Sequence, residues 1–267
     1  MPEVYYLFCL IAADRLPPLE GQGIDGEQPL FIERGPYVAA VLCGVPLEMF
    51  SGPDAEERLK DLAWIGPRAC RHEEVILAAR RHVPVLPVRF GTVFSTLELL
   101  AAALERHRER IAGFLKQAAG SDEWTVKGLL DRRKAREDIM NEKLNEQAAA
   151  LADLSPGKRY FMIQRIKSEA HKDLRARLRE LTKDVVKSLS PLTLDSAQRR
   201  LLSCDVTGGE EEMFFNGAFL VPGTALERLQ TMIAELNSRF EPRGMRFDLS
   251  GPWPPYSFAP VLDEASR

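Results

Sequence analysis

The hydrophobic positions in the first part of the chain form short apolar runs separated by a polar segment. Residues 4–12 are a β-branched and aromatic run, which predicts a strand buried on both faces. Residues 14–30 are rich in Gly, Pro and Asp and predict a loop. A second apolar run, 37–45, ends at Pro46 and predicts another strand. The chain is therefore expected to open with two strands joined by a long loop.

Helical spacing follows the second predicted strand. A helix is expected to begin at residues 51–54, where Pro53 suits a first turn. Gly66-Pro67 is expected to break it, because proline removes a helical hydrogen bond, and a second helix is predicted over 68–82. Both predicted helices carry apolar residues on one side, which is typical of amphipathic helices.

Residues 84–93 have an apolar strand pattern that prolines interrupt. Two prolines each remove a donor from the strand ladder, which predicts an edge strand or irregular pairing. An edge can bind an extended partner through its unpaired backbone groups, so Arg89 and Phe90 are candidate partner-binding residues. Arg89 lies in an otherwise apolar strand end and is expected to form a buried or half-buried ion pair. Gly91 is expected to adopt a turn conformation that other residues resist.

Two helix starts are predicted from the spacing of a capping box. Ser95 and Glu98 have this spacing, and Thr224 and Glu227 repeat it. After the first pair, apolar residues recur with helical spacing as far as Leu115. We therefore predict one long helix there, followed by a domain boundary.

The second half of the chain repeats this organisation. Residues 123–130 predict a strand, 131–154 a charged helix and 155–157 a turn. Residues 158–188 predict a long amphipathic helix, because apolar residues recur every third or fourth position throughout. The remaining predicted elements are two strands joined by a turn at 207–210, then a helix and a last strand, over 199–206, 212–221, 226–240 and 245–249.

The order of these later elements is β-α-β-β-α-β, with an additional helix in the first crossover. This order is typical of the ferredoxin-like fold. Strands grouped among helices, with antiparallel hairpins, indicate the α+β class. We predict an N-terminal α+β domain, a C-terminal ferredoxin-like domain and a flexible tail, over 1–120, 121–259 and 260–267.

The composition is that of a globular protein, with 45% hydrophobic and 28% charged residues. The formal net charge of -3 does not favour nucleic-acid binding by the whole molecule. No apolar stretch approaches the ~20 residues of a membrane span, and no basic residue precedes the first apolar run, so we expect a soluble cytoplasmic protein. The scattered cysteines predict reduced, mostly buried thiols, at Cys9, Cys43, Cys70 and Cys204.

The sequence holds no motif that predicts catalysis, a cofactor or a metal. Residues 21–26 match GxGxxG, but a dinucleotide site needs that motif between a strand and a helix, and here a strand-like segment follows it. His72 has no second helical ligand four residues on, where Ile76 stands, so it is expected to make a structural hydrogen bond. We therefore predict a protein that is not an enzyme and that binds no cofactor or metal.

The long predicted helix, 158–188, carries more basic than acidic residues. The favoured interpretation is a charged face that keeps the helix soluble. The same face could instead bind an acidic protein surface or RNA, with Arg175 and Arg179 as candidate contacts. An RNA-binding module that combines this helix with the C-terminal sheet is therefore the alternative function. The aromatic segment 213–219 lacks the flanking basic residues of an RNA-recognition strand and is expected to belong to the core.

Residues 251–258, Gly-Pro-Trp-Pro-Pro-Tyr-Ser-Phe, form a stiff and extended aromatic segment. One interpretation is a clasp that packs on the protein's own sheet, because aromatic residues at a strand end usually join a core. The other is a partner-binding surface, with Trp253 and Tyr256 as its contacts. The clasp is the favoured interpretation.

Several segments are more specific in combination than any single pattern. They are His-Glu-Glu-Val-Ile at 72–76, Val-Pro-Val-Leu-Pro-Val-Arg-Phe-Gly-Thr-Val-Phe at 83–94, Glu-Trp at 123–124, Ser-Pro-Gly-Lys-Arg-Tyr-Phe at 155–161, Gly-Ala-Phe-Leu-Val at 217–221 and the aromatic segment at 251–258. Together they resemble the gas vesicle protein F/L family over nearly the whole chain, from Val4 to Phe258.

The resemblance implies a two-domain α+β protein with a ferredoxin-like C-terminal domain. It implies a role as an accessory or minor structural component in forming gas vesicles, the protein-walled buoyancy compartments of some prokaryotes. It also implies binding to the small hydrophobic shell protein and to other gas vesicle accessory proteins, in the cytoplasm and at the gas vesicle. The family has no established catalytic residues, so the resemblance assigns none to this chain.

Overall fold

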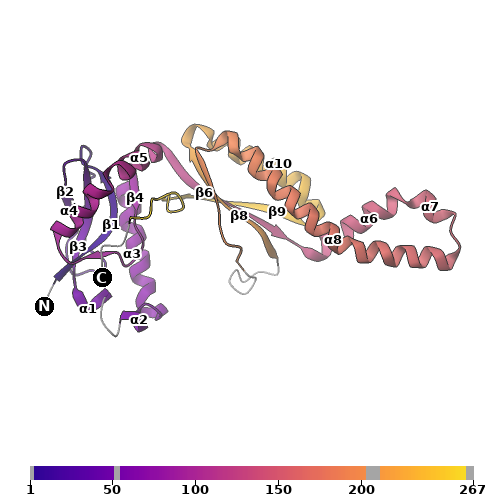
Figure 1. Ribbon diagram of the computed structural model, residues 1–267, viewed down its shortest axis with the longest axis horizontal. Coiled ribbons are helices and arrows are strands. Elements are labelled where there is room, and N and C mark those ends of the chain that lie inside the picture. The colour runs from indigo at the N-terminus through magenta and orange to yellow at the C-terminus, as the bar shows by residue number, and fades with distance from the viewer. Residues whose placement is uncertain (1–2, 51–54, 203–210, 263–267) are drawn as a thin grey trace. The chain divides into compact units, whose positions relative to one another are not determined.

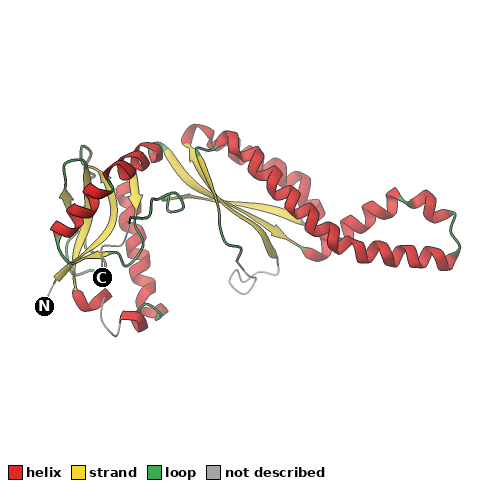
Figure 2. Cartoon of the chain, viewed as in Figure 1, coloured by secondary structure: helices red, strands yellow, loops and turns green. Residues whose placement is uncertain are grey.

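The computed structural model describes residues 3–50, 55–202 and 211–262. The chain divides into two compact units (Figure 1): a first unit of Met1–Glu123 and Pro252–Arg267, and a second unit of Trp124–Gly251. Both units contain helices and strands, which Figure 2 colours red and yellow, and the strands pair antiparallel. This combination confirms the predicted α+β class.

The first unit is built on a sheet with the strand order β2-β3-β1-β4, in which β5 also pairs with β1. Its strands are β1 (Glu3–Ala12), β2 (Phe31–Arg34), β3 (Val38–Pro46), β4 (Val85–Pro87) and β5 (Val93–Phe94). Its helices are α1 (Leu47–Phe50), α2 (Ala55–Arg58), α3 (Leu62–Arg80), α4 (Leu97–Arg106) and α5 (Arg108–Ala118). The proline-containing β4 stands at the end of the strand order, as the ladder donors lost to proline predict.

Strand β1 is buried on both faces, because apolar residues of α3 cover one face of the sheet and those of α4 and α5 cover the other. The pairing of β1 with β3 shifts register between Leu7 and Cys9. Tyr6, before the shift, and Phe8, within it, belong to the cluster that contains α3 residues. After it, Cys9 joins the same cluster, although strict alternation would place it on the opposite face. A β-bulge therefore lets consecutive residues enter one core.

The predicted helix break at Gly66-Pro67 is wrong, because α3 runs through it. The helix begins at Asp61, whose carboxylate accepts a hydrogen bond from the Ala63 N–H at 2.9 Å. Pro67 therefore falls in the second turn, where it removes a single backbone hydrogen bond. The guanidinium of Arg68 donates to the Trp64 carbonyl at 3.1 Å and lies over the Trp64 ring. The expected helix start at 51–54 lies outside the described residues, and α2 follows it.

The predicted capping box at Ser95 is displaced by one residue. Thr96 is the N-cap of α4, and its hydroxyl accepts from the Leu99 N–H at 3.3 Å. The single helix predicted beyond it is two helices, because the backbone of His107 (φ -103°, ψ 10°) ends α4 and precedes α5. Apolar periodicity continues across this residue, so the sequence pattern does not indicate where the first helix ends and the second begins.

The second unit has a four-stranded sheet in the order β7-β8-β6-β9. Its strands are β6 (Ser121–Leu130), β7 (Asp195–Gln198), β8 (Glu212–Pro222) and β9 (Met245–Trp253). Its α-helices are α6 (Arg132–Glu146), α7 (Ala148–Ala152), α8 (Pro156–Leu189) and α10 (Leu226–Phe240). Short 3-10 turns are η1 (Ser190–Leu192), η2 (Gly223–Ala225) and η3 (Glu241–Arg243).

The core of the second unit lies between one face of this sheet and the helices. Phe215 and Phe219 of β8 are buried there with Leu174 of α8 and Leu229 of α10. Their burial confirms that the aromatic segment 213–219 belongs to the core. The predicted long helix is also confirmed, and it begins two residues earlier than expected, since Ser155 is its N-cap and the predicted turn forms its first residues.

Two other predictions in the second unit are wrong. The strand expected over 199–206 is observed at Asp195–Gln198, and the described residues that follow, up to 202, are not in a strand. Strand β7 is polar and largely exposed, so apolar patterning does not mark it. The turn at 207–210 lies outside the described residues. Thr224 does not cap α10, because η2 precedes that helix and Ala225 is its N-cap, without a side-chain bond.

The segment after Gly251 belongs to the first unit, which corrects the expected C-terminal domain of 121–259. The Tyr256 hydroxyl donates to Glu73 at 3.0 Å, and Phe258 packs against the cluster of β1 with α4 and α5. Leu262, in the expected tail 260–267, packs against the same cluster, and residues 263–267 lie outside the described part. These contacts with residues distant in sequence decide which unit the segment joins.

Candidate functional site

The candidate residues at the end of β4 form a tight turn. The Arg89 carbonyl accepts from the Thr92 N–H at 3.2 Å and from the Thr92 hydroxyl at 2.7 Å. Gly91 has φ +83°, the left-handed conformation that glycine adopts readily. The Arg89 side chain is exposed and pairs with no carboxylate of the described ranges, so the expected buried ion pair is wrong. The turn directs the guanidinium to solvent, where it remains available for a partner.

Phe90 of the same turn belongs to the protein's own aromatic cluster. Its ring centroid lies 6.1 Å from that of Tyr6, 5.9 Å from Phe50 and 5.8 Å from His72, all in edge-to-face geometry. The side chain is half-buried. We therefore assign Phe90 to the packing of the first unit rather than to its exposed surface.

A buried polar network lies beside this cluster. The Tyr6 hydroxyl lies 2.8 Å from Nδ1 of His72 and accepts from the Gly91 N–H at 3.2 Å. Nε2 of His72 lies 3.1 Å from the Val88 carbonyl. Burial lowers the pKa of His72 from its ordinary 6.5 to about 4, although the Val88 carbonyl opposes the shift. Burial likewise raises the pKa of Tyr6. Both groups are therefore neutral at pH 7, and His72 makes the structural hydrogen bonds expected of it.

Two carboxylates of the first unit bind the C-terminal aromatic segment, residues 251–258, through hydrogen bonds. Glu123 is completely buried and accepts from the Ser257 N–H at 2.8 Å and from its hydroxyl at 3.1 Å. Tyr256 donates to Glu73, and burial together with that carboxylate raises the pKa of Tyr256. This half of the segment acts as a clasp. Trp253 is 42% exposed and remains a candidate partner contact.

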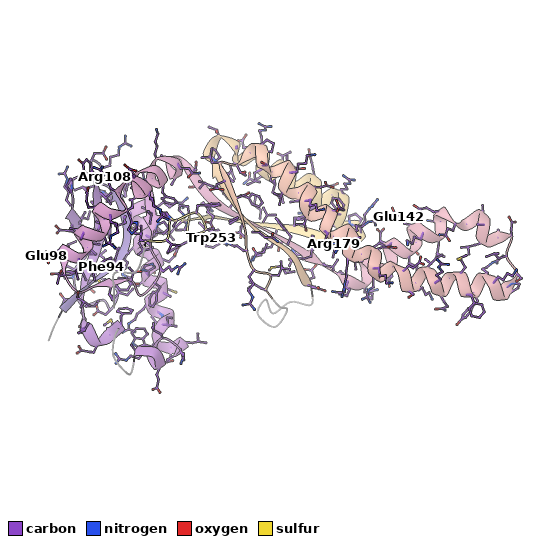
Figure 3. The ribbon with its side chains drawn as sticks, in the orientation of Figure 1. Phe94, Glu98, Arg108, Glu142, Arg179 and Trp253 are labelled. Atoms are coloured by element: carbon purple, nitrogen blue, oxygen red, sulfur yellow. The ribbon has the colours of Figure 1, made fainter. Side chains whose placement is uncertain are left out.

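Arg175 and Arg179 are exposed on α8, where Figure 3 labels Arg179, whereas Arg177 on the same helix is engaged. Arg177 donates to Glu142 of α6 and pairs with Asp138 at 3.6 Å, which ties the two helices together. Arg175 and Arg179 lie in the second unit, and the other four candidates lie in the first. Neither unit gathers all six candidate residues into one site.

Sequence reasoning missed an exposed aromatic surface at the start of α8, formed by Tyr160, Phe161 and Met162. Their side chains are 60%, 74% and 36% exposed, and the Tyr160 and Phe161 ring centroids lie 5.9 Å apart. Arg159 fixes this turn to α7 by donating to the Leu151 and Ala152 carbonyls at 2.9 and 3.0 Å. A signal was present: consecutive helical residues are about 100° apart, so three large apolar neighbours cannot share one buried face.

The residue types that could hold a metal or a cofactor are placed as follows. Among the residues that the structure describes, no three His, Cys, Asp or Glu side chains gather closely enough to hold a metal ion. The GxGxxG match at 21–26 lies in the loop between β1 and β2, where a Cβ on Gly23 would stand 2.4 Å from that of Cys43. That glycine is therefore explained by packing. Cys9 and Cys43 are buried and Cys70 is exposed, all three as reduced cysteines outside any disulfide, and Cys204 lies outside the described part.

The length and hydropathy of the described helices decide whether any of them could cross a membrane. Within the described ranges, none combines the length and apolar character needed to cross a membrane.

The aromatic residues of β8 that an RNA-binding sheet would use for stacking are covered, since Phe215 and Phe219 are buried beneath the helices. The alternative of RNA recognition through these rings is therefore not favoured.

Comparison with known proteins identifies relatives along nearly the whole chain. The profile of the family described as gas vesicle synthesis protein GvpL/GvpF matches residues 4–260. The chain is 29% identical over 256 residues to gas vesicle protein L of Streptomyces sp. (strain CB03234), covering 94% of this chain and 90% of that protein. It is 27% identical over 279 residues to gas vesicle protein L1 of Halobacterium salinarum (strain ATCC 700922 / JCM 11081 / NRC-1), covering 96% and 90%.

Solved structures share the fold. The crystal structure of gas vesicle protein GvpF from Anabaena sp. PCC7120 superposes with a TM-score of 0.70 at 18% identity, covering 97% of this chain and 99% of that one. GvpF from Microcystis aeruginosa gives a TM-score of 0.64 at 16% identity, with the same coverage. Because the family profile spans nearly the whole sequence and the fold agrees, this chain belongs to the gas vesicle GvpL/GvpF family.

Proposed function

We propose that this protein is an accessory or minor structural protein of gas vesicle formation that binds the shell protein and other gas vesicle proteins during assembly. The observation that carries the proposal is the family match over residues 4–260. The protein acts by binding in the cytoplasm and at the gas vesicle, and it needs neither a cofactor nor a metal. Its exposed candidates Arg89, Trp253, Arg175 and Arg179 are proposed secondary contacts.

The second unit is proposed to be a ferredoxin-like domain whose first crossover has been lengthened into a helical hairpin. The element order β-α-β-β-α-β and the strand order β7-β8-β6-β9 support this assignment. In that scheme α6, α7 and α8 occupy a crossover that a shorter domain fills with one helix. The lengthened part carries the exposed aromatic surface, so it is the part of the domain best suited to a binding role.

The exposed aromatic surface, Tyr160, Phe161 and Met162, is the proposed main contact. Large aromatic side chains left in water at the end of a rigid hairpin are typical of interaction sites, because their burial by a partner is strongly favourable. Fully burying a side chain of this size contributes about 1.5–3 kcal/mol. A small hydrophobic shell protein would expose apolar surface before it assembles, and this surface could hold it until it joins the wall.

The proposal is tested by complementing a strain that lacks the gene. The test variant carries Tyr160→Ser and Phe161→Ser. The matched control carries Gln164→Ser and Lys167→Ser, at exposed positions of the same helix. Electron microscopy of gas vesicles and co-purification of the shell protein are the two measurements. We expect vesicles and shell-protein capture with the wild-type chain and the control variant, and loss of both with the aromatic variant.

Two outcomes would overturn the proposal. One is normal vesicle formation in the deletion strain. The other is a purified protein that captures neither the shell protein nor any other gas vesicle protein. Salt-dependent RNA binding that is lost on reversing the charges of Arg175 and Arg179 would instead establish the RNA-binding alternative.

A further inference from the structure

The second unit has a sheet edge whose backbone is only partly satisfied. Strand β9 stands at the end of the order β7-β8-β6-β9, so one of its sides has no neighbouring strand within the described part of the chain. Edge strands expose N–H and C=O groups that can pair with another extended segment. The question is whether the protein blocks this edge or leaves part of it open.

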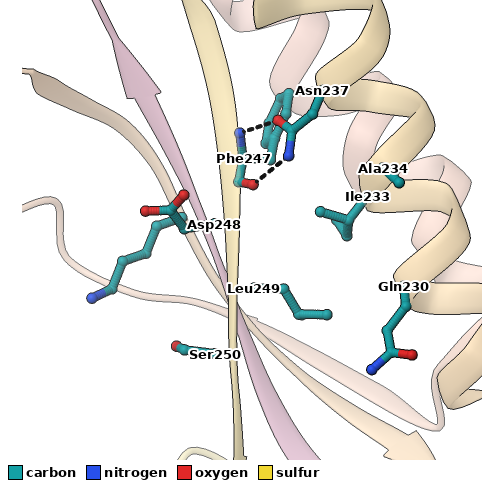
Figure 4. A pocket seen from close by; sticks show the side chains of 9 residues that line it. Gln230, Ile233, Ala234, Asn237, Phe247, Asp248, Leu249 and Ser250 are labelled. Carbon is teal, nitrogen blue, oxygen red and sulfur yellow. Dashed lines mark hydrogen bonds between the residues drawn. The ribbon is translucent and has the colours of Figure 1, made fainter.

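Asn237 of α10 blocks one position of the edge (Figure 4). Its side-chain NH₂ donates to the Phe247 carbonyl at 2.8 Å, and its amide oxygen accepts from the Phe247 N–H at 2.7 Å. The amide thus occupies the place of a neighbouring strand's peptide group. In an edge strand, both backbone groups of every second residue face outward. Because Phe247 faces outward, Leu249 does too, and no described side chain caps its backbone in the way that Asn237 caps Phe247.

An open groove of about 570 Å³ surrounds the uncapped part of the edge. Its wall on the α10 side contains the apolar Ile233, Ala234 and Leu249, with the amides of Gln230 and Asn237 beside them. On the other side of the strand, Asp248 and Ser250 point away from α10 (Figure 4). Lys127 of β6 also lines the groove, and strand alternation places it on the face opposite to the core residue Val126. Side chains of an added strand would alternate between these two sides. One set would meet the side that holds Ile233, Ala234 and Leu249, and the other the side that holds Asp248 and Ser250.

The charges on the polar side favour an acidic occupant. Asp248 is already paired with Arg246 of the same strand. Lys127 is half-buried and makes no ion pair or hydrogen bond with the rest of the described chain. A carboxylate on the bound segment would form an ion pair with Lys127, whereas a lysine or arginine there would meet the unpaired Lys127 cation. Strand order, uncapped backbone and charge therefore describe one kind of ligand.

We propose that the β9 edge beside Leu249 binds an extended segment of a partner protein, with apolar and acidic residues at alternate positions, by adding it to the sheet as a fifth strand. The inference rests on the proposed binding function and names the chemistry of one of its partners. The Asn237 amide sets where the added strand ends, because it already occupies the outward groups of Phe247.

The first test uses the full-length protein and fluorescently labelled, acetylated peptides. One peptide alternates valine with glutamate, and the control alternates valine with lysine. We expect the glutamate peptide to bind and the lysine peptide to bind at least about tenfold more weakly in fluorescence anisotropy. N-methylation of the alternate amides that face β9 should abolish binding, whereas N-methylation of the remaining amides should not. Equal effects of the two methylation patterns, or no binding of either peptide, would overturn the proposal.

Two variants locate the site. Ala234→Arg fills the apolar side from an exposed helical position and should abolish peptide binding, whereas Glu235→Arg, at the next exposed position, should not. Lys127→Glu should reverse the preference toward the lysine peptide. If Glu235→Arg weakens binding as much as Ala234→Arg does, or if the edge instead pairs two copies of this chain in sedimentation experiments, the proposal fails.

The outcome is separable from that of the proposed function. An Ala234→Arg protein that restores gas vesicles fully and still captures every partner would remove the β9 edge from the assembly role. It would leave the accessory function itself intact, because that function is tested by the deletion strain.

Discussion

Tyr6 donates its hydroxyl proton to Nδ1 of His72 at 2.8 Å, an arrangement that requires a neutral imidazole. The Val88 carbonyl can only accept, so Nε2 carries the ring proton and Nδ1 is left as an acceptor. The Gly91 N–H donates to the same Tyr6 oxygen and so fixes the turn that follows β4. The hydrogen bonds that join Tyr6, His72 and Val88 are thus all satisfied only while His72 is uncharged.

The first prediction concerns acid stability. The unfolded chain protonates His72 as the pH falls through its ordinary 6.5, whereas the folded chain does so only near 4. The stabilisation that the neutral His72 gives to the folded state is therefore complete above pH 6.5. It is lost as the pH falls from 6.5 to 4, and it amounts to about 3 kcal/mol. We expect urea unfolding to show stability falling across this window. His72→Gln should be less stable at pH 7 but should lose less on acidification, while His82→Gln, at an exposed position, should follow the wild-type profile. Parallel wild-type and His72→Gln curves would contradict this account.

The second prediction concerns the C-terminal clasp. Tyr256→Phe removes the hydrogen bond to Glu73 and leaves a half-buried carboxylate without that donor. We expect a loss of about 1–2 kcal/mol in the free energy of unfolding. Limited proteolysis should cut the variant earlier within residues 252–262. Tyr160→Phe, which alters an exposed hydroxyl, is the control and should change neither measurement. Unchanged proteolysis of Tyr256→Phe would show that ring packing alone holds the segment.

The third prediction concerns the turn before β9. Gly244 has φ +80°, and an added Cβ would lie 2.8 Å from the Ala135 nitrogen and 3.0 Å from the Asp131 carbonyl oxygen. Both contacts are to backbone, which cannot swing aside. Gly244→Ala should therefore lower the free energy of unfolding by about 2–4 kcal/mol.

The control for that glycine is Gly113, inside α5, where an added Cβ meets nothing within 4 Å. Gly113→Ala should stabilise the protein by about 0.5–1 kcal/mol, because alanine loses less conformational freedom in a helix. Thermal unfolding of the two variants measures both the loss of stability expected for Gly244→Ala and the gain expected for Gly113→Ala. A Gly244→Ala protein as stable as the wild type would mean that α6 can move away from this turn.

The fourth prediction concerns the proline inside α3. Pro67→Ala restores one backbone donor to the second turn and removes the clash of the ring with the preceding turn. We expect a gain of about 1–3 kcal/mol in stability. Pro156→Ala, at the first position of α8 where proline suits the helix, should give no gain. Circular dichroism during thermal unfolding distinguishes the two, and a destabilised Pro67→Ala protein would indicate that the ring makes a needed contact.

Local pattern predicted most of the regular structure in this chain. The buried strands β1, β3 and β8 and the long helix α8 are continuous apolar or amphipathic runs, and such runs have few alternative ways to bury their side chains. Strand β7 escaped prediction because it is polar, and its place depends on backbone pairing with residues 217–220. The wrongly predicted caps at Ser95 and Thr224 show that the spacing of a capping box does not determine which residue is the N-cap.

The candidate sites divide in the same way. The sequence by itself identified the family, the polar role of His72 and the turn at Gly91, since each depends on residue type at a particular position. Only the tertiary structure placed the aromatic segment on the first unit, left Tyr160 and Phe161 in water and capped Phe247 with Asn237. Those outcomes depend on which distant surfaces meet and on which backbone groups remain unpaired after they meet. A linear pattern specifies what a residue can bury or bond, whereas the packed chain decides which of those possibilities is already satisfied.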